Sequence, residues 1–389
     1  MNKKVKKIAY HLHLWLGGIS GLIMFIVCIT GAIWAVGIHN WFGVNPSAPK
    51  IEVVAGQELM APSVLTEKLA DTLKGAQPMF IRYERDRPAA MRVYGDEANL
   101  WITLNPYTAD IISYKDYNDK SSSSSMSFWD YMRWGHRALW LPWDVGRVIV
   151  NYGTLTFLIV LVSGLILWIP KSRKGLKNRL TFNWKRGTKL KRKLYDMHLV
   201  LGFYASFFLI VICCTGMVWG LDWWSKATYK ITTGDSLPPW GNVEAPKGAT
   251  DLVSEMALPL KMDFLFYRAI EENPNAEAIT VTYPERDNEN ATIGIKISHD
   301  EQVLYNYDSF YYNQHSLREV TSSSYRDGRY SAKSLGEKLR RQNYDLHIGS
   351  IWGKVGQVLM FFAALFGASL PLTGYYILFV VKRKKKKKE

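Results

Sequence analysis

The sequence predicts a membrane α-helical bundle of four transmembrane helices, arranged as a parallel internal repeat, with two small α+β domains on one side of the membrane. Of the 389 residues, 48% are apolar, and they concentrate in four runs of about 20 residues or more, the length that spans a bilayer. These runs are Leu14–Val36, Val148–Ile169, Leu199–Leu221 and Val355–Val381. A second observation is that the order of helix, long polar segment and helix occurs twice along the chain.

Basic residues orient these helices in the membrane. Four lysines lie in residues 1–11, eleven lysines or arginines and no acidic residue lie in 171–193, and seven basic residues and one acidic residue lie in 382–389. Because cytoplasmic loops carry the excess of Lys and Arg, we expect these three segments and both chain termini to be cytoplasmic. The net charge of +15 then indicates topology and an anionic lipid partner, and it argues against nucleic-acid binding.

The predicted division of the chain follows from these spans. It consists of residues 1–36 (cytoplasmic N-terminus and first helix), 37–147 (first outward domain with an interfacial segment), 148–170 (second helix), 171–198 (basic cytoplasmic loop), 199–221 (third helix), 222–354 (second outward domain), 355–381 (fourth helix) and 382–389 (basic cytoplasmic tail).

An internal repeat relates the two halves. A shift of 185 residues places His13 on His198, Gly17 on Gly202, and Thr30-Gly31 on Thr215-Gly216; a shift near 210 places Val148 on Val358 and Gly164 on Gly374; and His136 corresponds to His347 after a one-residue gap. Both halves have the same orientation, so we expect a symmetry axis along the membrane normal, as in a parallel repeat.

Each outward domain has the pattern of a small α+β unit, with one helix and several strands of alternating apolar residues. In the first domain we expect a helix over Ala61–Ala76 and strands over Met79–Glu84, Ala89–Tyr94, Trp101–Leu104 and Ile111–Tyr114, followed by a flexible linker at Ser121–Ser125. In the second we expect a helix over Leu252–Asn273 and strands over Ala278–Tyr283, Ala291–Ile297, Val303–Asn306 and Leu317–Val320.

The cysteines exclude one kind of cofactor attachment. Cys28, Cys213 and Cys214 all lie inside predicted spans, and no CxxCH sequence occurs, which excludes covalently attached c-type haem. The chain also has no GxGxxG motif, P-loop or flavin-domain module, so an electron donor would have to be a separate molecule.

Four histidines form the strongest candidate site. His13 and His198 lie at the cytoplasmic ends of the first and third helices, and His136 and His347 lie at the outer edge, before the second and fourth. Two histidines near each face suit two non-covalent b-type haems, because a low-spin haem iron takes one imidazole on each side and helices hold such ligands rigidly. We therefore predict these four histidines as axial ligands of two haems.

Other residues fit the same interpretation. Gly17 and Gly202 follow the inner histidines by four residues, on the same helix face, where a haem ring meets no opposing side chain. Cationic side chains at each level suit haem propionates: Lys7 and Arg192 at the inner level, and Arg133 and Arg137 at the outer level.

Other interpretations of these residues remain open. Single histidines in a membrane can hydrogen-bond between helices, and histidine pairs can bind copper, although no Met-rich cluster or cysteine adjoins them. His39 is a reserve ligand for the outer haem or a distal-pocket group, whereas His11, His299 and His315 suit interfacial or surface positions. Four tryptophans around His136 suit an interfacial belt or a wall for the haem: Trp129, Trp134, Trp140 and Trp143.

The helix sequence from His13 to Thr30-Gly31, together with its repeat from His198 to Thr215-Gly216, resembles the PepSY-associated transmembrane family of bacteria. That family includes ferric-siderophore reductases of the inner membrane. The segment Leu104–Asp110 resembles the PepSY strand-turn signature, with Ala109 where glycine is more usual. In the second domain Tyr311–His315 occupies that place and lacks the proline.

The resemblance implies PepSY-like outward domains and a haem-dependent oxidoreductase that reduces ferric siderophores outside the inner membrane. In that scheme electrons enter at the His13–His198 level from a cytoplasmic flavin reductase or from quinol, and leave at the His136–His347 level. Three alternatives remain: a siderophore permease, a non-redox regulatory scaffold, and a haem electron-transfer subunit that serves another periplasmic acceptor.

Overall fold

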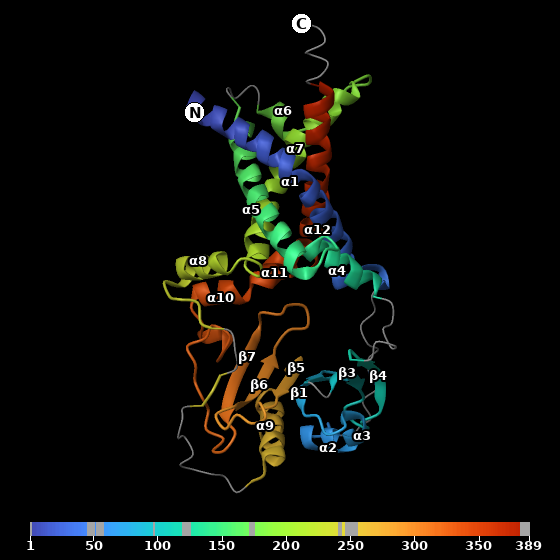
Figure 1. Ribbon diagram of the computed structural model, residues 1–389, viewed down its shortest axis with the longest axis vertical. Coiled ribbons are helices and arrows are strands. Elements are labelled where there is room, and N and C mark those ends of the chain that lie inside the picture. The colour runs from blue at the N-terminus through green and yellow to red at the C-terminus, as the bar shows by residue number, and fades with distance from the viewer. Residues whose placement is uncertain are drawn as a thin grey trace. The chain divides into compact units, whose positions relative to one another are not determined.

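The computed structural model describes residues 2–44, 51, 58–95, 98–118, 126–170, 176–239, 243–245 and 256–381. The chain forms two compact units, and each consists of segments far apart in the sequence (Figure 1). Unit 1 comprises Met1–Asn45, Met126–Ile231 and Asn343–Glu389, and unit 2 comprises Pro46–Ser125 and Thr232–Gln342. The predicted linker Ser121–Ser125 and the tail 382–389 lie outside the described residues.

Unit 1 is a bundle of four long helices, as predicted. The helices are α1 (Lys3–Ile38), α5 (Trp143–Trp168), α7 (Leu190–Met217) and α12 (Gly353–Tyr375), and the last continues as a π-helix over Tyr376–Val381. All four segments are long and apolar enough to cross a membrane. Apolar side chains such as Ile19, which is 70% exposed, face outward, as expected for helices surrounded by lipid tails rather than water.

The four helices pack in a closed ring in which each contacts two neighbours. The adjacent pairs are α1 with α5, α5 with α7, α7 with α12, and α12 with α1. The buried centre of the ring includes Met24, Phe157, Leu209 and the two thiols of Cys28 and Cys213. Helix α1 begins at Lys3, and the side chain of Asn2 caps it by accepting a hydrogen bond from the Lys4 amide at 2.9 Å.

Short helices close one end of the bundle (Figure 1). Helix α4 (Phe128–Ala138) packs against α1 and α5, and α11 (Asn343–Ile348) packs against α7 and α12. Ser127 caps α4, since its hydroxyl accepts a hydrogen bond from the Asp130 amide at 3.1 Å. These two helices carry His136 and His347, so helix packing rather than a loop positions both histidines.

The remaining described helices are shorter. They are α2 (Pro62–Lys68), α3 (Ala70–Leu73), α6 (Lys177–Leu180), α8 (Asp222–Thr233), α9 (Leu258–Glu272) and α10 (Leu335–Arg341), with 3₁₀ turns at Trp41–Gly43, Tyr330–Ala332 and Ser350–Trp352. The helix predicted over Ala61–Ala76 is thus divided between α2 and α3. Residues 252–255 of the helix predicted over Leu252–Asn273 lie outside the described residues.

Unit 2 is one seven-stranded sheet rather than two separate domains. The strands are β1 (Pro78–Glu84), β2 (Ala89–Tyr94), β3 (Asn99–Leu104), β4 (Ile111–Asp116), β5 (Ala278–Thr282), β6 (Thr292–Ser298) and β7 (Tyr307–Asn313), in the spatial order β4-β3-β2-β1-β5-β6-β7. Antiparallel pairing of β1 with β5 joins the two predicted domains, with Arg82 opposite Thr280. The two predicted α+β domains therefore share one sheet, in which the edges of β1 and β5 pair with each other instead of being exposed.

The second half of the sheet also corrects two predicted strands. Residues 304–305 form a bend, and within Leu317–Val320 only Glu319 forms a bridge, to Tyr312. The actual strand, β7, lies between the two predicted segments. The turn after β7 nevertheless matches the turn after β3: the amides of Ala109 and Leu317 both donate to an asparagine carbonyl at 2.9 Å. Both residues have positive φ, at 69° and 58°, the conformation that favours glycine.

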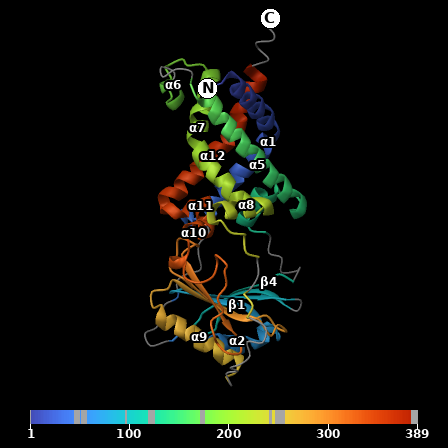
Figure 2. The same cartoon turned by 90° about the vertical axis from the view of Figure 1, so that its left-hand side faces the viewer.

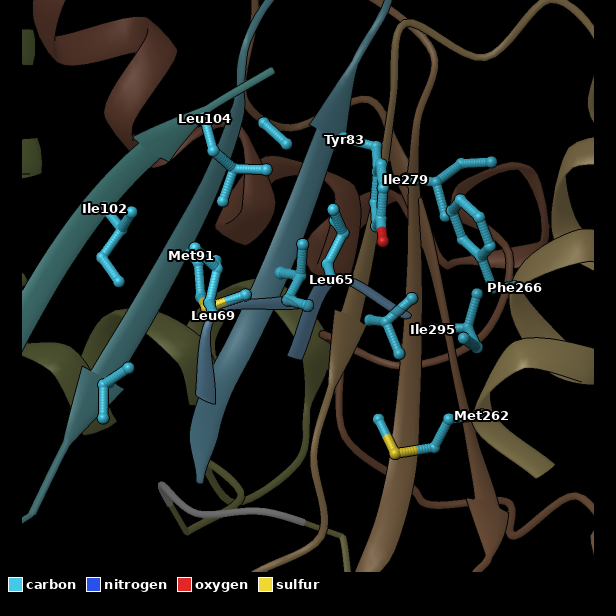
Figure 3. Packing of buried hydrophobic residues seen from close by; sticks show 14 of the residues in the cluster. Leu65, Leu69, Tyr83, Met91, Ile102, Leu104, Met262, Phe266, Ile279 and Ile295 are labelled. Carbon is cyan, nitrogen blue, oxygen red and sulfur yellow. The ribbon is translucent and has the colours of Figure 1, made fainter. Parts of the chain in front are cut away.

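The hydrophobic core of unit 2 lies between the sheet and helices α2 and α9 (Figures 2 and 3). Alternate strand residues such as Ile81, Met91 and Ile295 are buried and meet Leu65 of α2 and Phe266 of α9. The period-2 alternation that predicted the strands thus marks the face that the helices cover.

Candidate functional site

Two histidine pairs form within the bundle, and each pair joins two elements far apart in the sequence. His13 of α1 and His198 of α7 have ring centroids 6.1 Å apart, with an angle of 82° between the ring planes. His136 of α4 and His347 of α11 have centroids 6.2 Å apart, at 59°. Each pair joins the two histidines that the sequence assigns to the same level of the membrane.

These distances suit one metal ion between the rings of each pair. An imidazole nitrogen lies about 2 Å from a bound transition metal, and the ring centre lies roughly 1 Å behind that nitrogen, so two rings on opposite sides of one metal have centroids about 6 Å apart. Edge-to-face packing of two rings gives centroid distances of the same size, so the hydrogen bonds made by the other ring nitrogen are needed as a second observation.

A main-chain carbonyl or a hydroxyl group holds the Nδ1 atom of every one of the four rings. Nδ1 lies 3.0 Å from the Val160 carbonyl oxygen in His13, 2.8 Å from that of Val27 in His136, and 3.1 Å from that of Ile212 in His347. Because a carbonyl oxygen only accepts, Nδ1 must be the protonated nitrogen in these three rings. Their Nε2 atoms therefore keep a lone pair, as in metal-bound histidines oriented by a second hydrogen bond.

The same conclusion holds for His198. Its Nδ1 lies 2.9 Å from the Thr373 hydroxyl oxygen, and that hydroxyl already directs its hydrogen to the carbonyl oxygens of Ser369 and Leu370, each at 3.0 Å. The hydroxyl must accept from His198, so Nε2 of His198 is also the unprotonated nitrogen.

One short sequence pattern on each long helix provides these contacts. An aliphatic residue is followed after three positions by Ser or Thr and after four by Gly, in residues 27–31 (VCITG), 160–164 (VLVSG), 212–216 (ICCTG) and 370–374 (LPLTG). In each copy the hydroxyl group donates to the aliphatic residue's carbonyl oxygen, at 2.9–3.2 Å. The copies on α1 and α5 hold His136 and His13, and those on α7 and α12 hold His347 and His198.

The glycine of each copy makes room for the histidine ring. A methyl group on Gly31 would lie 2.7 Å from Nδ1 of His136, and one on Gly164 would lie 2.9 Å from Cε1 of His13. The equivalent distances are 3.1 Å between Gly216 and His347 and 3.4 Å between Gly374 and His198. Any side chain at Gly31 or Gly164 would therefore displace the imidazole.

Each histidine pair opens into a cavity of about 330 Å³. The His13–His198 cavity is lined by Gly17 and Gly202, together with Tyr10, Tyr195 and Arg179. Arg179 belongs to α6 and donates to the main-chain oxygens of Leu167 and Trp168 at the end of α5. This arrangement places a cationic side chain at the rim of a mostly apolar pocket.

The His136–His347 cavity has two indole walls and two arginines. Trp34 lies 5.8 Å from the His136 ring and Trp219 lies 5.3 Å from the His347 ring, measured between centroids. Arg137 and Arg147 line the cavity, and both guanidinium groups lie over Trp143, at 4.6 and 5.8 Å. This cavity therefore combines a flat apolar interior with adjacent positive charge.

The family model for the PepSY-associated TM region matches residues 10–382. The chain belongs to this family. The match includes both histidine pairs and all four copies of the Ser/Thr-Gly pattern. A search of curated proteins found no match.

The geometry of this PepSY-associated protein does not bring every predicted residue to the cavities. Lys7 and Arg192 are not among the lining residues of the His13–His198 cavity, and Arg192 instead pairs with Asp196 at 2.9 Å. Arg133 pairs with Asp130 at 2.8 Å, away from the lining of the His136–His347 cavity. Among the predicted cationic side chains, Arg137 alone lines a cavity.

The other histidines have separate environments. Nε2 of His39 lies 3.1 Å from the Ile348 carbonyl oxygen, and His39 is not among the residues that line either cavity. His299 pairs with Asp308 at 3.1 Å, and Nε2 of His315 lies 3.0 Å from the Glu289 carbonyl oxygen. His11 is exposed and contacts Tyr10.

The predicted tryptophan cluster divides into different environments. Trp143 lines the His136–His347 cavity, whereas Trp140 stacks on Tyr131 and Trp134 donates to the Leu141 carbonyl oxygen. Trp129 packs against Gly37. Trp34 and Trp219, which contact the two histidines of this cavity, are related by the same 185-residue shift as His13 and His198.

Phe157 connects the two cavities. Its side chain, only 4% exposed, belongs to the lining of both cavities. The two histidine pairs lie far apart along the bundle, since His13 and Gly31, which contacts His136, are separated by roughly 27 Å of helix axis. A buried aromatic ring thus occupies the region between the two sites.

Proposed function

We propose that this chain is a di-haem b membrane oxidoreductase that passes electrons across the inner membrane of a bacterium and reduces ferric siderophores on the outer side, releasing Fe(II). One observation carries the proposal: two imidazole pairs have the spacing of opposed ligands on one metal, and the Nδ1 atom of each ring is held by a hydrogen bond. Among the described residues, no group of three or more His, Cys, Asp or Glu side chains could hold a metal. Two histidines alone therefore suit an iron whose remaining ligands come from a porphyrin.

The chain's residues would perform distinct tasks. His13 and His198 would ligate one haem iron, and His136 and His347 the other. Gly17 and Gly202 leave space for a flat ring, and Arg179, Arg137 and Arg147 suit propionate carboxylates. When bound, each haem would supply a one-electron redox centre.

The orientation and the reaction are parts of this proposal. With the basic segments 1–11 and 171–193 in the cytoplasm, the His13–His198 site lies at the inner level and unit 2 lies in the periplasm. The donor would be external, either a cytoplasmic flavin reductase or quinol. Reduction helps release because siderophore oxygens are hard donors that suit Fe(III) better than Fe(II).

We also attribute the fold to a parallel repeat with two PepSY-like halves in unit 2. The four copies of the Ser/Thr-Gly pattern support this, because Thr30-Gly31 and Thr215-Gly216 follow the 185-residue shift while Ser163-Gly164 and Thr373-Gly374 follow the 210-residue shift. The matching turns at Ala109 and Leu317 support it in unit 2.

Proteoliposomes test the function directly. With reductant inside and a ferric siderophore plus an Fe(II) indicator outside, we expect Fe(II) to form outside with wild-type protein. The rate should fall at least about tenfold in His13→Ala, because one axial ligand is lost. His39→Ala is the matched control and should retain the activity. Equal rates in wild type, His13→Ala and protein-free vesicles would overturn the proposal.

A further inference from the structure

One face of the sheet in unit 2 lies opposite the two helices that cover the core. On β6 this face is largely buried, and Lys296 is the one residue of that strand that keeps partial exposure. Along β1, Ile81 and Tyr83 point into the core with helices α2 and α9, so Arg82 points to the opposite face. Along β6, Ile295 and Ile297 are buried in the same core, so Lys296 also points to the opposite face. Figure 2 shows α2 and α9 together on one side of the strands.

The register brings these two cations close together at the centre of that face. Arg82 pairs with Thr280, and Thr280 pairs with Lys296. The cations thus flank one small hydroxyl side chain, with main chains about 10 Å apart across two strand spacings. Ser309 follows Lys296 in the same row, but it is only 7% exposed, so Thr280 is the hydroxyl that lies between the two charges.

The positive charge at this place is incompletely compensated. Arg82 pairs with Glu84 at 2.7 Å, but no described carboxylate lies within ion-pair distance of Lys296. Its ammonium group instead lies 3.9 Å from the Tyr307 ring centroid. Burial, with Arg82 and then Arg341 nearby, lowers the pKa of Lys296 to about 8, which an approaching anion would reverse.

Aromatic side chains occupy the neighbouring row of the same face. Phe80 lies two residues before Arg82 on β1, and its ring contacts Trp101 of β3 with centroids 6.2 Å apart. Trp101 is 39% exposed, and its strand partner on β4 is Lys115. The face therefore offers flat rings beside cationic side chains.

We propose that this face binds an anionic aromatic metal chelate of the ferric tricatecholate type, with its negative charge at Arg82 and Lys296 and a ring against Trp101 and Phe80. Charge complementarity selects an anionic ligand, and the exposed rings select an aromatic one. The proposal rests on the proposed function for the fate of the iron. Binding itself requires no electron transfer.

Gallium(III) chelates separate binding from reduction, because gallium(III) has the coordination chemistry of iron(III) but is not reduced. The full-length protein in detergent is titrated with gallium tricatecholate and with a neutral gallium trihydroxamate, and binding is followed by calorimetry. We expect the anionic chelate to bind, and Lys296→Met and Arg82→Gln each to weaken it about tenfold. Lys68→Met on α2 is the control and should change the Kd less than about twofold.

Three outcomes would overturn the site: no binding of the tricatecholate, equal binding of the neutral chelate, or an unchanged Kd in Lys296→Met. The absorption spectrum of each variant is recorded in parallel and should match that of wild type. Binding lost in Lys296→Met from a protein that carries no haem would sustain this site and overturn the redox function. Reduction of bound haem in a protein that does not bind the chelate would support the redox function and overturn this binding site.

Discussion

A histidine ligand is defined by both of its ring nitrogens. In all four rings Nδ1 is used locally, by three carbonyl oxygens and the Thr373 hydroxyl, and this fixes the tautomer that leaves Nε2 as an acceptor. The Ser/Thr of each copy bonds the same helix turn, and the glycine provides the space. The orientation of each histidine ring is thus set by the helix that packs against it.

The glycine of each copy is expected to be essential for the position of the histidine ring. Gly31→Ala would place a methyl group 2.7 Å from Nδ1 of His136, so the ring must turn away and break its bond to Val27. Because mutation of groups that orient a ligand typically costs 10–100-fold in metal affinity, we expect about tenfold or more weaker haem binding at His136–His347. Haem titration of the apoprotein measures this. The His13–His198 site is the internal control, and two unchanged affinities would contradict the account.

A pH dependence follows from Lys296. Its pKa is lowered to about 8, so its charge is present below that pH and is lost as the pH rises through it. Affinity for the gallium tricatecholate should therefore decrease between about pH 7.5 and 9.5. Arg82 and Arg341 keep their charges over this range, and Tyr307, whose pKa burial raises, stays neutral.

Lys296→Arg is the matched control for that titration, since arginine remains charged throughout. Its binding should stay constant over the same range. A wild-type affinity independent of pH would show that Lys296 does not carry the interaction.

At the scale of elements, the sequence predicted best what depends on local chemistry. The four spans are long apolar runs, and β1 and β2 alternate cleanly, so all were found. Strand β7 was missed because its sequence, YDSFYYN, mixes aromatic and polar residues without a simple alternation. The pairing of β1 with β5 joins residues about two hundred positions apart, which no local pattern reports.

In the candidate site, too, features set by local sequence were predictable and features set by tertiary packing were not. The histidine pairs were predictable because the repeat places equivalent residues at equal depth. The positions of Arg179 and Arg147 at the cavities were not predictable. They depend on where α6 ends and where α5 begins, which the sequence pattern does not report. The Ser/Thr-Gly pattern was visible in all four helices, but only the fold shows which histidine each copy holds.

The core of unit 2 depends on helix α9. Phe266 is fully buried against the sheet, so Phe266→Ala should lower the free energy of unfolding of this unit by about 3–5 kcal/mol. Pulse proteolysis in urea measures the change. Leu260→Ala on the same helix is the control, since that side chain is 56% exposed; it should have an effect of less than about 1 kcal/mol. Equal effects would contradict the packing described.

At the scale of the whole molecule, the two units have different proposed roles. The bundle holds two histidine pairs at different depths, with Phe157 in the lining of both cavities, and the sheet carries cationic and aromatic side chains on one face. In the proposed orientation the sheet is periplasmic. The chain would thereby combine an electron path through the membrane with a binding surface for an anionic chelate.

Orientation has its own test, because the native cysteines all lie within the spans. Tyr94→Cys, at a position 70% exposed in unit 2, should react with a membrane-impermeant maleimide in spheroplasts. Lys185→Cys, in the basic segment 171–193, should react only after the membrane is permeabilised. The opposite labelling pattern would invert the proposed topology.

The most direct test of the central claim is the haem-to-polypeptide ratio of purified protein, taken from the oxidised-minus-reduced absorption spectrum. We expect two haems per chain in the wild type and one in His347→Ala, with the spectrum of two imidazole ligands in each case. A colourless protein, or a ratio that His347→Ala leaves unchanged, would contradict the account.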